Sequence, residues 1–204
     1  MTKKVLLLGS NGGIGSSLLQ AMSDEYDVTA WTSKDLDLNC PEKIFDCNFA
    51  DYDILINCAG HNHGSWQGAL QNTWQNQLSM IMVNYVANLF LLKHYAKSRT
   101  SGLYVWISST SMDTPTPYQS IYAGTKVGSK FSIDLMSKEA NHIKVLEAKI
   151  GLVKTNMRYR NFQGTKTWEE IEQTYGNAKH IPVETVAQKI LRGINSGKNQ
   201  LVIV

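Results

Sequence analysis

Short apolar runs alternate with longer mixed segments along most of this chain. The runs of strand length lie near 4–8, 27–31, 35–38, 53–57, 103–108, 144–150 and 200–204. The segments of helical length lie near 13–23, 41–49, 76–97, 119–140 and 183–196. Alternation of strand and helix is typical of α/β proteins, in which successive strands run parallel. The pattern therefore predicts a doubly wound, mainly parallel sheet of seven strands.

The connection between the second and third predicted strands is unusually short. The second ends near Trp31 and the third begins at Asp35. A right-handed helical crossover between parallel strands needs a dozen or more residues. We therefore expect the crossover helix to be missing or truncated, so that this edge of the sheet is trimmed.

Length and composition favour one domain that spans residues 1–204. The net charge of +3 is too small to indicate nucleic acid or a membrane surface as a partner. Apolar runs of about five residues cannot span a bilayer. The three cysteines lack Cys-x-x-Cys spacing, which indicates reduced thiols and a cytoplasmic location. The long segment 156–181 lacks a clear period and is interpreted as a substrate lid.

A glycine-rich turn follows the first predicted strand. It reads Gly9-Ser10-Asn11-Gly12-Gly13-Ile14-Gly15 and leads into a helix. Glycines allow a tight turn and close backbone approach, and the first N–H groups of a helix attract an anion such as pyrophosphate. The spacing differs from the common Gly-x-Gly-x-x-Gly pattern. A glycine-rich turn without a ligand is the alternative interpretation.

A second site combines Ser109, at the end of a predicted strand, with Tyr122 and Lys126 on a predicted helix. Residues four apart share one helix face, and a nearby ammonium favours the ionised form of a phenol. Such a tyrosine can exchange a proton with a substrate oxygen. The Tyr-x-x-x-Lys spacing alone is weak, because chance gives about 0.7 matches in this chain. A second match, Tyr175 to Lys179, lacks a preceding strand with a serine.

Together with further motifs, these sites resemble the short-chain dehydrogenase/reductase family, whose fold is Rossmann-type. The further matches, in order, are Asn57-Cys58-Ala59-Gly60 for Asn-Asn-Ala-Gly, Asn84 for a catalytic asparagine, Ile107-Ser108-Ser109 for Ile-Ser-Ser, and Ile150–Thr155 for Pro-Gly-x-Val-x-Thr. The resemblance covers nearly the whole chain. Cys58 and Ile150 depart from the family pattern, which has asparagine and proline at these positions.

The resemblance implies an NAD(P)-dependent oxidoreductase that acts on a small-to-medium carbonyl or alcohol. Tyr122 would protonate the carbonyl oxygen while Ser109 donates a hydrogen bond to it. Lys126 would hold the nicotinamide ribose, and Asn84 would retain a water that feeds protons through the lysine. The loop 110–120 suggests a moderately apolar substrate. A dinucleotide-binding redox sensor without turnover is the alternative function.

The same resemblance assigns positions that bind the dinucleotide. They are Gly9, Ser10, Asn11, Gly13, Ile14, Gly15, Thr32, Ser33, Lys34, Asp37, Leu38, Asn57, Ala59, Gly60, Tyr122, Lys126, Ile150, Val153 and Thr155. NAD-selective relatives place a carboxylate at the end of the second strand. Two hydroxyls and Lys34 stand there instead, which favours NADP(H), because a cation bonds a 2′-phosphate well. In the alternative, Lys34 is solvated and Asp35 reaches the ribose.

Two further expectations concern metals and assembly. His61 and His63 have no accompanying carboxylate or thiolate pattern, so we expect no metal. In the family, the helices that match 76–97 and 119–140 pair across a two-fold axis, which implies a homodimer or homotetramer.

Overall fold

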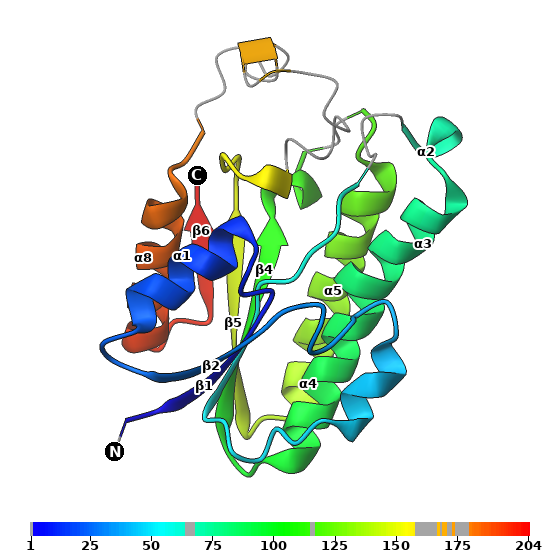
Figure 1. Ribbon diagram of the computed structural model, residues 1–204. Helices are drawn as coiled ribbons and strands as arrows, with labels where there is room; N and C mark the ends of the chain where they lie inside the picture. Colours follow the sequence, from blue (N-terminus) through cyan, green and yellow to red (C-terminus); the bar gives the residue numbers. More distant parts are fainter. Residues whose placement is uncertain are drawn as a thin grey trace.

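The computed structural model describes residues 2–63, 68–114, 117–157, 167, 169–170, 173 and 180–204. Within these residues six parallel strands form one sheet in the order β2-β1-β3-β4-β5-β6 (Figure 1). The strands are β1 (Lys4–Leu8), β2 (Asp27–Trp31), β3 (Ile54–Asn57), β4 (Gly102–Ser109), β5 (Ile143–Ile150) and β6 (Gln200–Ile203). The strand order reverses between β1 and β3, and open α/β sheets bind ligands at the carboxyl ends of strands flanking such a point.

Helices cover both faces of the sheet. One face carries α1 (Gly13–Met22) and α8 (Val183–Ser196), and the other carries α4 (Ala87–Ser98) and α5 (Ser120–Glu139) (Figure 1). A short α2 (Gly68–Gln71) and α3 (Trp74–Ile81) precede α4, and a π-helical turn, η3 (Met82–Val86), joins α3 to α4.

Apolar residues alternate between two cores, one on each face. In β1, Val5 and Leu7 pack in the core that α1 and α8 close, while Leu6 and Leu8 pack in the core beneath α4. A strand buried on both faces needs apolar residues at every position, which explains the continuous apolar runs in the sequence.

The predicted seventh strand, at 35–38, is wrong. Residues 32–40 form turns instead, in which the N–H groups of Asp35 and Leu36 bond the Thr32 carbonyl oxygen at 3.1 Å. Leu36 and Leu38 are buried in the core near α4, so their spacing imitates a strand because a loop places both side chains inward. The segment predicted as a helix at 41–49 is a 3₁₀-helix, η1 (Pro41–Asp46).

The absence of the crossover helix is confirmed, but the short connection is not, because the strand at 35–38 that bounded it does not form. The chain passes from β2 to β3 through turns and η1, without an α-helix between them. The cleft at the end of β2 is therefore bordered by a loop rather than by a crossover helix. Within the described part of the chain, none of the helices is both long and apolar enough to cross a membrane.

Candidate active site

The glycine-rich turn brings β1, β3 and α1 into close contact. Gly9 has a left-handed φ of +74°, and a Cβ there would lie 2.6 Å from the Ala59 nitrogen. A Cβ on Gly15 would lie 2.1 Å from the Gly9 carbonyl oxygen. Gly12 caps α1 without a side-chain hydrogen bond, and the first turn of α1 holds no acidic residue. The N–H groups at the start of α1 therefore suit a bound anion, and this turn fits a dinucleotide pyrophosphate.

Two cavities meet in front of this turn and form one cleft. The larger, of about 750 Å³, extends past the ends of β1 and β2 to Asn39. The smaller, of about 350 Å³, lies against the end of β4 and the start of α5. Their shared wall includes Ile14, Cys58, Ala59, Gly60, Thr155 and Met157. The cleft thus follows the carboxyl ends of the strands, and an extended ligand such as a dinucleotide can lie along it with one half in each cavity.

Most of the predicted dinucleotide positions line this cleft. They are Gly9, Asn11, Gly13, Ile14, Thr32, Ser33, Asp37, Leu38, Ala59, Gly60, Tyr122, Lys126, Ile150, Val153 and Thr155. Burial raises the pKa of the Cys58 thiol to about 12, so this cysteine contributes a neutral thiol to the wall.

Four predicted positions lie outside the cleft wall. Ser10 Oγ donates to the Trp31 carbonyl oxygen at 3.0 Å, and Gly15 is buried at the start of α1. Asn57 bonds Asn88 Oδ1 at 2.8 Å and accepts from the Ala59 nitrogen at 3.0 Å. These three residues support the wall from beneath.

The fourth, Lys34, stands in an exposed turn at the end of β2. Asp35 Oδ2 accepts from the Thr32 nitrogen at 2.8 Å and from Thr32 Oγ1 at 3.0 Å. These hydrogen bonds, with the nearby Lys34 charge, lower the pKa of Asp35. Thr32 Oγ1 in turn accepts from the Lys34 nitrogen at 3.2 Å. The turn is therefore closed by bonds between near neighbours in sequence, with both a carboxylate and an ammonium beside the cleft.

Ser109 lies at the end of β4 and opens into the smaller cavity. Its Oγ accepts from the Ser111 nitrogen at 3.2 Å and from Ser111 Oγ at 2.9 Å. A hydroxyl has two acceptor lone pairs and one donor proton. With both lone pairs used, Ser109 retains its own proton for a hydrogen bond to an oxygen in the cavity.

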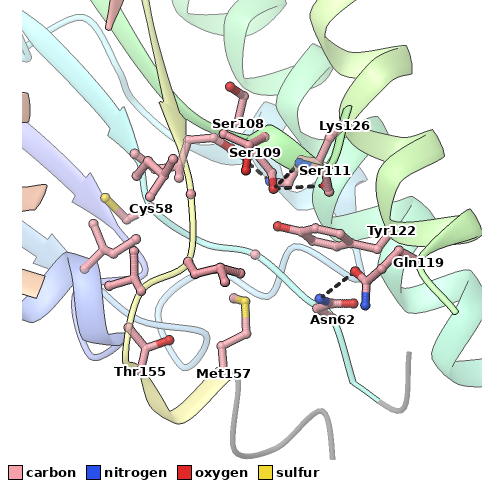
Figure 2. Close-up of a pocket in the computed structure, with 18 of the residues that line it drawn as sticks. Cys58, Asn62, Ser108, Ser109, Ser111, Gln119, Tyr122, Lys126, Thr155 and Met157 are labelled. Carbon is pink, nitrogen blue, oxygen red and sulfur yellow. Dashed lines mark hydrogen bonds between the residues drawn. The ribbon is translucent and has the colours of Figure 1, made fainter. Parts of the chain in front are cut away.

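Tyr122 and Lys126 line the same cavity from one face of α5. Figure 2 shows the phenol pointing into the cavity, with Ser109 and Lys126 on the same side of its ring. Lys126 is 3 % exposed, and its Nζ donates to the Ile107 carbonyl oxygen at 2.9 Å and lies 5.7 Å from the Tyr122 ring centroid. Burial lowers the pKa of Lys126 to about 8. The structure thus brings together the three residues that the sequence predicts.

Asn84 is fully buried in η3 and lines neither cavity. Its Oδ1 accepts from the His61 nitrogen at 2.8 Å, and its Nδ2 donates to the His61 carbonyl oxygen at 2.7 Å. Its own carbonyl oxygen accepts from Asn88 Nδ2 at 2.6 Å and Ser129 Oγ at 2.8 Å. Asn84 therefore ties the loop after β3 to η3 and α5.

Comparison with known protein families agrees with this geometry. A sequence model described as short chain dehydrogenase matches residues 43–166, which is more than half of the chain. The chain belongs to the short-chain dehydrogenase family. A comparison with curated proteins gives no match.

Solved structures give the same fold for this short-chain dehydrogenase. A small-chain dehydrogenase in complex with NADPH has a TM-score of 0.83 at 17 % identity, covering 100 % of this chain and 97 % of the other. The protein lin1944 from Listeria innocua has a TM-score of 0.80 at 14 % identity, covering 100 % of both chains. A short-chain dehydrogenase from Sphingobium yanoikuyae in complex with NADPH has a TM-score of 0.78 at 19 % identity, covering 98 % and 87 %.

The sequence predicts that the loop 110–120 shapes the pocket but singles out none of its polar residues, of which Thr110, Ser111, Thr114 and Gln119 line the smaller cavity. Sequence reasoning also missed Asn62, which lines the cavity from the loop after β3. Ser111 could have been found, because a serine two residues beyond a strand end can turn back toward it. Asn62 and Gln119 come together from positions 57 residues apart, and no spacing pattern connects them.

The predicted lid, 156–181, lies mostly outside the described residues. Its two ends are described: Asn156 and Met157 border the cleft, and the Ile181 nitrogen donates to the Leu152 carbonyl oxygen at 2.7 Å. Among the residues that the structure describes, no three or more potential metal ligands gather in one place.

Proposed function

We propose that this short-chain dehydrogenase transfers a hydride between NADP(H) and a small-to-medium carbonyl or alcohol, with Ser109, Tyr122 and Lys126 as its catalytic residues. The observation that carries the proposal is their convergence on the 350 Å³ cavity. A proton donor, a hydrogen-bond donor and a buried cation there face the end of a cleft that fits a dinucleotide.

The bound nicotinamide would supply the hydride that reduces the carbonyl carbon, or accept it in the reverse direction. Tyr122 would give its phenolic proton to the carbonyl oxygen as the C–O double bond becomes a single bond, so that an alcohol forms. Ser109 would donate its proton in a hydrogen bond to the same oxygen, stabilising negative charge as it develops. The two hydrogen bonds from Ser111 to Ser109 Oγ keep that proton directed toward the substrate.

Lys126 would contribute its positive charge beside the phenol. An ammonium near Tyr122 stabilises the phenolate that remains after proton donation. Its bond to the Ile107 carbonyl oxygen fixes the Nζ below the cavity, where it could also bond a ribose hydroxyl. Because the pKa of Lys126 is lowered to about 8, we expect this charge at neutral pH and its loss in more alkaline solution.

We assign Asn84 a positioning role. Both lone pairs of its backbone carbonyl oxygen already accept hydrogen bonds from side chains. Its side-chain amide bonds the backbone N–H and carbonyl groups of His61. A water-holding role for Asn84 stays a prediction. The contacts favour the interpretation that Asn84 fixes the loop from Ala59 to His61, which forms one wall of the cleft.

The preference for NADP(H) rests on the turn after β2. Thr32 and Ser33 line the cleft and Lys34 adds a cation beside them, although the Thr32 hydroxyl proton is directed to Asp35. The Asp35 carboxylate opposes a 2′-phosphate, but its bonds to Thr32 hold it within the turn. Several proteins of the same fold are complexes with NADP(H), which is consistent with this preference.

A homodimer or homotetramer is also proposed. Leu78 and Ile81 on α3, and Phe131 and Leu135 on α5, are between 38 % and 68 % exposed although large and apolar. These helices contact each other and each exposes large apolar side chains, which supports an assembly through this helix pair. We expect sedimentation velocity to give at least twice the chain mass of 22.8 kDa at micromolar concentration. A monomer there would contradict this proposal, and Phe131→Asp should weaken the assembly.

The function is tested with purified protein in two steps. NADPH binding is first titrated by fluorescence, and NADPH oxidation is then followed over a panel of aldehydes, ketones and keto-sugars. We expect binding, and oxidation that depends on at least one carbonyl compound. Binding without turnover across the panel would contradict catalysis and favour the redox-sensor alternative.

A further inference from the structure

Two buried amides border the smaller cavity next to Tyr122. Asn62 lies in the loop after β3, and Gln119 directly precedes α5. They are 7 % and 9 % exposed, and both line the cavity. Figure 2 shows them on one side of the Tyr122 ring, with Ser109 and Ser111 on the other. If the carbonyl oxygen of a substrate lies between Ser109 and Tyr122, the remainder of the substrate lies close to this amide pair.

The contact between the two amides is long. Asn62 Nδ2 and Gln119 Oε1 are 3.5 Å apart, whereas a good N–H···O hydrogen bond measures about 2.9–3.0 Å. A substrate hydroxyl can accept a hydrogen bond from the amide of Asn62 and donate one to the carbonyl oxygen of Gln119. The pair thus offers an adjacent donor and acceptor, which matches the hydrogen-bonding capacity of an alcohol group.

The rest of the cavity wall favours an uncharged ligand. Hydroxyls of Thr110, Ser111 and Thr114 add to its polarity. Among the described residues of this wall, Lys126 alone carries a formal charge, and it bonds the Ile107 carbonyl oxygen. Against the described part of this wall, a substrate carboxylate or ammonium would lose hydration and find at most the Lys126 charge to offset that loss. At about 350 Å³, the cavity is near the lower end of ligand sites, and a nicotinamide ring would occupy part of it.

We propose that Asn62 and Gln119 form a hydroxyl-recognition subsite, and that the substrate is a neutral hydroxycarbonyl compound of a few carbon atoms, or the diol formed from it. The inference rests on the proposed function and narrows its substrate from a small-to-medium carbonyl or alcohol to a hydroxylated one, in place of the moderately apolar compound that the loop 110–120 suggests. In the competing interpretation, the amides only join the loop after β3 to the start of α5.

The test uses two pairs of carbonyl compounds that differ by hydroxyl against methyl: hydroxyacetone with 2-butanone, and glycolaldehyde with propanal. For each pair we divide the kcat/KM of the hydroxylated compound by the kcat/KM of the compound that has a methyl group instead. A hydroxyl also raises the intrinsic reactivity of a carbonyl, so the change of this ratio in variants decides the matter. Gln119→Met and Asn62→Leu keep the side-chain size but remove the amide. Each should lower the ratio about tenfold, mainly by raising KM for the hydroxylated compound.

Met157→Leu is the matched control, because it alters an apolar residue of the same cavity. It should change kcat/KM for both members of a pair by a similar factor. Ratios that stay at the wild-type value in both amide variants would overturn the subsite while leaving the oxidoreductase intact. A lower melting temperature without a change in ratio would assign the amides a structural role alone. No NADPH oxidation with any of the four compounds would overturn the subsite, and failure across the wider panel would overturn the proposed function too.

Discussion

The two ends of the cleft are built in different ways. At the end beside α5, which we propose to be catalytic, the contacts connect distant parts of the chain. Lys126 bonds Ile107, Asn84 bonds His61, and Ser129 bonds Asn84 across 19, 23 and 45 positions respectively. At the end beside β2, where the proposed function places the adenosine, the turn from Thr32 to Asp35 is closed by bonds between residues at most three positions apart, all near solvent.

Because of this difference, substitutions that affect the reaction and substitutions that affect the choice of dinucleotide should fall at opposite ends of the cleft. A buried polar group that loses its partner costs about 1–3 kcal/mol, so single changes at the catalytic end should be severe. Exposed charge pairs contribute about 0–1 kcal/mol, so the turn after β2 should tolerate substitution. We therefore expect cofactor preference to be retuned by one residue while the catalytic residues remain in place.

Tyr122→Phe should have the largest effect. It removes the proton donor but keeps the ring, so kcat should fall by about 10²–10⁴ while the dissociation constant for NADPH changes less than about twofold. Steady-state kinetics and fluorescence titration measure the two quantities. Tyr85→Phe is the control, because Tyr85 bonds Ser132 and lies outside the cleft. A Tyr122→Phe enzyme with more than a few per cent of wild-type kcat would show that another group donates the proton.

Ser111→Ala should have an intermediate effect. The substitution removes one of the two donors to Ser109 Oγ and frees a lone pair, so the Ser109 proton is no longer confined to the cavity direction. We expect kcat to fall about tenfold with little change in KM, which corresponds to about one hydrogen bond lost in the transition state. Ser23→Ala, an exposed serine at the carboxyl end of α1, is the control. An unchanged kcat would show that Ser111 does not direct the Ser109 proton toward the substrate.

Substitutions in the turn after β2 should change selectivity by smaller factors. Asp35→Asn removes the carboxylate that repels a 2′-phosphate but can still accept from Thr32, so NADPH should bind about two to five times more tightly. Lys34→Ala should weaken NADPH by a similar factor, and both variants should bind NADH as the wild type does. Titration of both dinucleotides, with Asp24→Asn as control, tests this. Tighter binding of NADH than NADPH, unaltered in Lys34→Ala, would refute the NADP(H) preference.

The smallest expected effect is on stability in alkaline solution. Folded Lys126 releases its proton near pH 8, whereas an unfolded lysine keeps it to about pH 10.4. Between these values the unfolded chain binds more protons, so this group makes the free energy of unfolding rise with pH. From pH 8 to 9, the free energy of unfolding of the wild type, measured in urea, should rise by about 1 kcal/mol relative to that of Lys126→Met. If the free energies of unfolding of the two proteins change with pH in the same way, the pKa of Lys126 is not lowered.

The sequence predicts buried, periodic features better than loops. Helix α8 was expected at 183–196 and is found at Val183–Ser196, because Gly197 ends it in a left-handed conformation. Ser109, Tyr122 and Lys126 are predicted together because Tyr122 and Lys126 share one helix face and Ser109 ends the preceding strand. The strand at 35–38 was wrong because Leu36 and Leu38 point inward from a loop. The meeting of Asn62 with Gln119 depends on tertiary packing alone.

The most direct test of the account follows a single hydride. NADPH deuterated at the transferred position of nicotinamide C4 is incubated with the protein and a carbonyl compound that it reduces, and the product is analysed by mass spectrometry and NMR. The account predicts one deuterium on the carbinol carbon for each NADP⁺ formed, with only trace product from Tyr122→Phe. Undiminished product from Tyr122→Phe, or alcohol without deuterium, would contradict hydride transfer at this cleft.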